Sequence, residues 1–152
     1  MKKELILIVI MSVILSMDLV YAEDTSNFDR ETAKIYLEKG IIARMGGDNQ
    51  AAIAFFTKAI EADSAYAEAY ESRGMSYGSG QINDYDKAIM DYSKAIELEP
   101  NNDEFYFGRA LCYYYKKDYS KTWDDIHKAE QLGFNAPPGF LEELKRASGR
   151  DK

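Results

Sequence analysis

The sequence has few of the residues on which disulfides, metal sites and most enzymes depend. Its 152 residues include one cysteine, Cys112, and one histidine, His127. A lone cysteine cannot form an internal disulfide, and its apolar setting in RALCYYY favours a buried small side chain over a reactive thiol. The motif HExxH, paired CxxC and a phosphate-binding glycine loop are also missing. We therefore expect no enzymatic activity, no metal and no cofactor.

Positive charge is scarce as well. The chain has 19 lysines and arginines against 26 aspartates and glutamates, which gives a formal net charge of −7. Nucleic acids and anionic membrane surfaces attract proteins with an excess of basic residues. The acidic balance therefore argues against both as partners.

The longest apolar run lies at the N-terminus and is short for a membrane-spanning helix. Lys2 and Lys3 precede the apolar segment Leu5–Met17, and the sequence VYA, which ends at Ala22, resembles a small-residue cleavage site. This order predicts a secretory signal peptide over residues 1–22, and hence a periplasmic or secreted protein without a membrane segment after cleavage. An uncleaved membrane anchor is the alternative.

What the chain does contain is a pattern that recurs about every 34 residues. The stretch DYDKAIMDYSKAIELEP, which ends at Pro100, has a weaker copy before it and another after it. Equivalent alanines in the three copies, Ala59, Ala95 and Ala129, are separated by 36 and 34 residues. Each copy follows a second shared segment, which reads YLEKG, YESRG and YFGRA in turn. A fixed period with two helical segments in each copy is typical of a helical solenoid.

The pattern resembles the tetratricopeptide repeat, in which pairs of antiparallel helices stack into a superhelix. The resemblance implies an all-α solenoid of three repeats, over residues 33–66, 67–102 and 103–136. Residues 23–32 are predicted to be a flexible lead-in. After Pro137-Pro138, three apolar residues share one helical face: Phe140, Leu141 and Leu144. We therefore expect residues 137–152 to form a capping helix and tail that cover the last repeat.

Several single residues fit paired helices. Small residues would let the two helices of each repeat approach closely, at Gly40, Gly74 and Ala110. Three aspartates, Asp48, Asp84 and Asp118, are placed to cap the second helices. Pro100 should end the second helix of the middle repeat. The turn of the middle repeat, which contains GSGQIN, is two residues longer than its counterparts.

The resemblance also implies a concave groove, lined by the first helix of each repeat, that receives a partner segment. The aligned groove positions are Leu37, Ile41, Met45, Glu68, Glu71, Met75, Glu104, Phe107, Leu111 and Tyr114. We expect Phe107, Leu111 and Tyr114 to be partly exposed there. The alternative is that the terminal helix covers them.

One known groove type of this family holds the terminal carboxylate of chaperone tails with lysines, asparagines and an arginine. The aligned positions here carry Leu37, Ile41, Ser72, Glu104 and Gly108, and none of them matches. An anionic peptide terminus is therefore a poor expectation. An apolar or aromatic peptide flanked by basic residues fits the glutamates around the groove better.

The sequence thus predicts a protein–protein interaction module, an adaptor or scaffold that binds a partner protein or peptide in its groove. Two alternatives stay open. The chain could be a self-assembling structural protein, and so a homo-oligomer, or an accessory subunit of an envelope or secretion complex.

Overall fold

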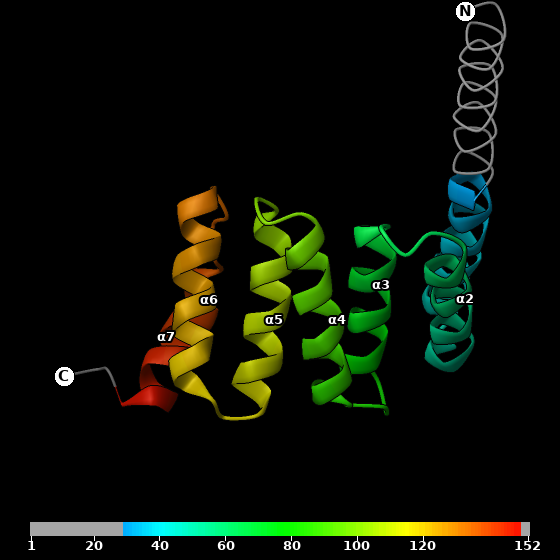
Figure 1. The fold of residues 1–152 in the computed structure, drawn as a ribbon. Helices are drawn as coiled ribbons and strands as arrows, with labels where there is room; N and C mark the ends of the chain where they lie inside the picture. The colour runs from blue at the N-terminus through cyan, green and yellow to red at the C-terminus, as the bar shows by residue number, and fades with distance from the viewer. Residues whose placement is uncertain (1–28, 150–152) are drawn as a thin grey trace, which may run out of the picture.

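The computed structural model describes residues 29–149 and contains helices and no strand within that range. The first helix occupies residues 29–45. The others are α2 (Asn49–Ala62), α3 (Ala67–Gly78), α4 (Tyr85–Leu98), α5 (Asp103–Tyr115), α6 (Tyr119–Leu132) and α7 (Pro138–Ser148). The helices from α3 to α6 stand side by side in one row, with α2 and the first helix at one end and α7 at the other (Figure 1). This is the predicted all-α solenoid of three helix pairs and a capping helix.

The turns within the pairs follow the expected capping chemistry. Asp48, Asp84 and Asp118 each accept a hydrogen bond from the backbone N–H three residues later, at 2.9, 3.2 and 3.3 Å. The middle turn runs over residues 79–84, whereas the other two span 46–48 and 116–118. α4 ends at Leu98, with Glu99 as its C-cap directly before Pro100. The predicted caps, the longer middle turn and the proline stop are all confirmed.

Close packing explains the glycines inside the first helices. A Cβ atom added to Gly40 would lie 2.6 Å from Cδ1 of Phe56, and one added to Gly74 would lie 3.3 Å from the ring of Tyr92. Phe56 is fully buried. The aromatic ring of each second helix therefore occupies the space that a side chain on the first helix would need, as the small residues predict.

The start of the first helix corrects one prediction. Residues 29–32, expected to be part of a flexible lead-in, are helical. The Arg30 guanidinium lies 2.6 Å from Oδ2 of Asp63 and 3.9 Å from the centre of the Tyr66 ring. These two contacts with the segment after α2 hold the beginning of the helix in place. The polar sequence of residues 23–32 does not predict these contacts, because both partners of Arg30 lie more than thirty residues away.

The capping helix is present as predicted. Leu144 of α7 is fully buried in a cluster with Ala110, Trp123 and Ile126. The Trp123 indole N–H donates a hydrogen bond of 3.2 Å to the hydroxyl of Ser148. α7 therefore closes the apolar end of the third repeat.

The predicted signal peptide, residues 1–22, lies outside the residues that the structure describes. Among residues 29–149, no helix has both the length and the apolar character needed to cross a membrane.

Candidate functional site

A hollow on the described part of the chain lies between α3 and α5, the first helices of the second and third repeats. Its volume is about 510 Å³. It is lined by Gly74, Met75, Gly78, Ser79, Gly80, Asn83, Tyr85, Tyr92, Gly108, Leu111, Cys112 and Tyr115. We call this feature the α3–α5 hollow. Neighbouring first helices thus form a concave surface, as the resemblance implies.

Glycines on both sides of one tyrosine leave this space open. The ring of Tyr92 lies between Gly74 of α3 and Gly108 of α5, and a Cβ on Gly108 would overlap that ring and lie 2.8 Å from its Oη. Burial raises the pKa of Tyr92, so its phenol stays neutral. The packing role of Gly108 was missed from the sequence. Small residues were matched there with a ring of the same repeat, whereas Tyr92 belongs to the repeat before Gly108.

Two tyrosines and a buried thiol complete the walls. The rings of Tyr85 and Tyr115 stack with centroids 5.1 Å apart and an interplanar angle of 12°. Cys112 is 5 % exposed, and burial raises the pKa of its thiol to about 11. The thiol is therefore protonated at neutral pH, which agrees with the predicted role as a small buried side chain and not a nucleophile.

The predicted groove residues divide into several groups. Met75 and Leu111 both line the α3–α5 hollow. Leu37 does not: it is 4 % exposed and belongs to the core around Phe56, so its assignment to the groove is wrong. Ile41 packs partly against the same core. Met45 is 82 % exposed at the end of the first helix and does not line the hollow.

The capping segment covers two of the three aromatic and aliphatic positions expected on α5. The Phe107 ring stacks on Phe134 with centroids 4.4 Å apart, and its centroid lies 5.9 Å from that of Phe140. The Tyr114 hydroxyl donates a hydrogen bond of 2.8 Å to a carboxylate oxygen of Glu143. Both side chains are half-buried. Phe107 and Tyr114 are thus partly exposed, as expected, but they pack against the capping segment and do not line the α3–α5 hollow, whereas Leu111 does.

Three of the predicted residues, Glu68, Glu71 and Glu104, form the acidic trio at the N-terminal ends of α3 and α5. Glu68 and Glu104 are exposed, and Glu71 is half-buried. Burial, followed by the charges of Glu104 and Glu68, raises the pKa of Glu71 to about 7, while Arg44 acts in the opposite direction. A second carboxylate-rich surface continues from Glu104 through Asp103 to Glu99.

The arginines of the shared segments carry a structural feature that was not recognised in the sequence. Arg73 binds both carboxylate oxygens of Asp91, at 2.8 and 2.7 Å, and donates to the Thr57 hydroxyl at 3.1 Å. One repeat later, Arg109 binds Asp125 at 2.8 Å through both oxygens and donates to the Ser93 hydroxyl at 3.0 Å. Each arginine thus joins the two helices of its own repeat to the second helix of the preceding repeat. The signal was available, because arginine, aspartate and hydroxyl residues recur with the same period.

No metal centre is formed within residues 29–149, where no three histidine, cysteine, aspartate or glutamate side chains meet in a suitable arrangement. His127 is exposed and stacks on Trp123 with centroids 5.6 Å apart.

Two family models match the sequence. One described as "TPR repeat" matches residues 81–116, and one described as "Tetratricopeptide repeat" matches residues 21–74.

Curated relatives match this chain over a small part of their own length. The protein SGT1 homolog of Homo sapiens is 28% identical over 101 residues, which is 66% of this chain and 27% of that protein. Tetratricopeptide repeat protein 12 of Mus musculus is 26% identical over 124 residues, 82% of this chain and 17% of the relative. The chain therefore spans less than a third of the length of these two proteins.

Solved structures share the fold. The first repeat domain of Spaghetti (RPAP3), bound to the HSP90 peptide SRMEEVD, aligns with a TM-score of 0.72 at 20% identity, over 80% of this chain and 94% of that one. The TPR2B domain of yeast Sti1, in a complex with an Hsp70 peptide, gives 0.69 at 20% identity over 80% and 99%. MamA gives 0.63 at 30% identity over 66% and 58%.

Proposed function

Because the chain is a tetratricopeptide repeat protein, we propose that it is an interaction module that binds an extended segment of a partner protein along α3 and α5. The observation that carries this proposal is the α3–α5 hollow, a space of about 510 Å³ with the side chains of Met75 and Leu111 at its wall. A hollow of this size accepts one large apolar side chain with its backbone. We propose an adaptor or scaffold role, without catalysis by this chain.

The comparison structures support the peptide-binding role, although the peptide in one of them does not suit the charge of this chain. The repeat domains of RPAP3 and Sti1 were solved with peptides of HSP90 and Hsp70. The HSP90 peptide ends in EEVD and is acidic. The surface next to the hollow here carries the acidic trio, which would repel such a peptide. We therefore propose that the partner is a different class of segment.

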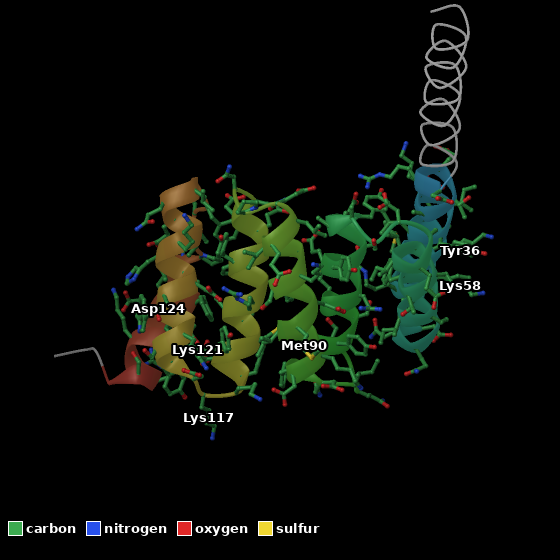
Figure 2. The ribbon with its side chains drawn as sticks, viewed as in Figure 1. Tyr36, Lys58, Met90, Lys117, Lys121 and Asp124 are labelled. Atoms are coloured by element: carbon green, nitrogen blue, oxygen red, sulfur yellow. The ribbon has the colours of Figure 1, made fainter. Side chains whose placement is uncertain are left out.

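The test is a selection of peptides from a random displayed library against the full chain, followed by fluorescence polarisation with the enriched peptides. Met75→Trp should fill the hollow and weaken binding at least about ten-fold, because the apolar anchor can no longer enter. The matched control is Met90→Trp, since Met90 is 70 % exposed on the second helix α4 (Figure 2). Circular dichroism would verify that both variants remain helical. Equal binding by the two variants would contradict the proposal.

Self-assembly is the second candidate function. On the first helix, Ile35 is 48 % exposed and Ile42, seven residues later on the same face, is 68 % exposed. Apolar side chains in such a row favour association with another copy. Light scattering over a range of concentrations would separate the two: a Met75→Trp variant should associate as the wild type does, whereas Ile35→Glu/Ile42→Glu should stay monomeric.

Export remains part of the proposal, supported by the order of basic, apolar and small residues over residues 1–22. Intact mass measurement of the protein recovered from an expressing cell tests it. Loss of 22 residues supports export, and a full-length chain in the cytosolic fraction contradicts it.

A further inference from the structure

The acidic trio and the α3–α5 hollow lie on one continuous strip of surface. On α3, Glu68, Glu71 and Met75 are spaced by three and four residues and so share a helical face. On α5, Glu104 stands four residues before Gly108 and seven before Leu111. Both helices therefore present carboxylates first and then, one to two turns later, the walls of the hollow.

Charge on this strip is not balanced within the described part of the chain. No lysine or arginine among residues 29–149 forms an ion pair with Glu68, Glu71 or Glu104, although the other carboxylates packed into the fold, Asp91 and Asp125, each have an arginine. Four charged groups act on Glu71 from the surrounding elements: Glu68 on α3, Glu104 on α5, Glu99 after α4 and Arg44 on the first helix. Three of the four are acidic, so a cation placed among them would relieve repulsion.

We propose that the partner segment carries a lysine or arginine two positions away from an apolar side chain, with the cation held by Glu68, Glu71 and Glu104 and the apolar side chain in the α3–α5 hollow. This inference rests on the proposed function and specifies the chemistry of its ligand. It applies to an internal segment of a protein, since the three carboxylates of the strip would repel a terminal carboxylate.

The spacing follows from backbone geometry. The middle of the hollow, between Met75 and Gly78, lies five to six residues beyond Glu71, or about 8 Å along α3 at 1.5 Å per residue. An extended peptide advances about 3.3 Å per residue and places alternate side chains on the same side. Residues two apart are therefore separated by about 7 Å and both face the strip. The flexible stem of lysine or arginine covers the small difference.

The experiment uses acetylated and amidated synthetic peptides of nine residues in a glycine–serine background. Each peptide has phenylalanine at position 4 and lysine, arginine, glutamine or glutamate at position 6. A further peptide places the lysine next to the phenylalanine, at position 5. Binding to the full chain is measured by fluorescence polarisation. We expect the lysine and arginine peptides at position 6 to bind at least about ten-fold more tightly than the others, and more weakly as salt increases.

Paired protein variants identify the binding groups. Glu71→Gln/Glu104→Gln should remove the preference for the lysine peptide over the glutamine peptide. The control, Glu97→Gln/Asp124→Asn, makes the same change of charge at exposed positions on the second helices α4 and α6 and should keep the preference. In the wild type, binding of the lysine peptide should tighten between pH 6 and 8, because Glu71 must lose its proton to pair with the cation. Glu71→Gln should weaken this pH dependence.

The outcomes separate the two levels of the proposal. If the random selection yields peptides that Met75→Trp rejects, but the lysine and glutamine peptides bind alike, the inference about charge is overturned and the proposed function stands. If binding of the lysine peptide is unchanged by Glu71→Gln/Glu104→Gln, the placement of the cation is overturned. If neither the selection nor the synthetic peptides give binding that Met75→Trp weakens, both fail.

Discussion

At the scale of single residues, Gly108 determines whether α5 can approach α4. Alanine normally stabilises a helix relative to glycine by about 1 kcal/mol. At position 108 the added Cβ would overlap the Tyr92 ring, so Gly108→Ala should destabilise the protein by about 1–3 kcal/mol. Chemical denaturation measures the difference. Gly139→Ala in α7 is the control, because a Cβ there meets nothing within 4 Å; it should be neutral or slightly stabilising. A stable Gly108→Ala variant would show that Tyr92 can move aside.

Glu71 should make the stability of the fold depend on pH. Its pKa is raised from 4.5 to about 7 in the folded protein. Below about pH 4.5 the Glu71 carboxyl is protonated in both the folded and the unfolded protein, and its contribution to the free energy of unfolding is fully present. As pH rises to 7 and beyond, the folded state must accommodate the charge, and stability is lost. Glu71→Gln removes this cost and should stabilise the protein at pH 8 by about 1 kcal/mol, after allowance for solvent screening of a half-buried group.

The measurement is urea denaturation of wild type and Glu71→Gln at pH 5 and pH 8. The difference in free energy of unfolding between the two proteins should be larger at pH 8. The opposite order would mean that the charge of Arg44 outweighs the effects of burial and of the neighbouring carboxylates on Glu71.

At the scale of helices, Arg73 and Arg109 each join the two helices of one repeat to the second helix of the preceding repeat. The Arg109 and Asp125 side chains are 20% and 9% exposed, respectively. Asp125→Ala would leave the Arg109 guanidinium without its carboxylate and should cost about 3 kcal/mol, near the lower end for buried pairs because part of Arg109 reaches solvent.

The control removes a carboxylate from an exposed pair. Glu142 lies 3.0 Å from Lys145 on α7 and its side chain is 65% exposed, so Glu142→Ala should change stability by less than about 0.5 kcal/mol. Thermal or chemical denaturation of both variants gives the comparison. Equal effects would mean that Arg109 finds another partner when Asp125 is absent.

At the scale of the whole molecule, the fold could be predicted from the sequence because its signals are periodic. Helix pairs, aspartate caps and the capping helix all depend on residues close in sequence or on an approximately 34-residue repeat. The site was predicted in part. Met75 and Leu111 line the hollow, but Leu37 is buried, because alignment to a family position does not show how far a helix is rotated toward its core.

The remaining features depend on contacts between distant residues. Arg30 meets Asp63 and Tyr66 across the first helix pair, and Phe107 meets Phe134 and Phe140 across the end of the third. Neither contact is periodic, since each occurs where the array ends and its exposed face must be covered in a particular way. Ends of a solenoid are therefore less predictable from sequence than its interior.

The repeats also differ in the ion pairs that join their helices. Where the second and third repeats have Arg73 with Asp91 and Arg109 with Asp125, the first has Lys39 and Phe55, which cannot form the same pair. The third repeat is further held by α7 through Leu144. In a solenoid, stability adds up from each repeat and its interface with the next, so unequal ties should produce unequal local opening.

We therefore expect unfolding to begin at the N-terminal end of the described array. Native-state hydrogen exchange followed by mass spectrometry should give lower opening free energies for amides in residues 29–45 and α2 than for those in α5 and α6. Asp125→Ala should lower the opening free energies in α5 and α6, so that those at the two ends of the array become more similar. Uniform protection along the wild-type chain would instead mean that the packing between repeats, and not the arginine–aspartate pairs, sets the cooperativity of the fold.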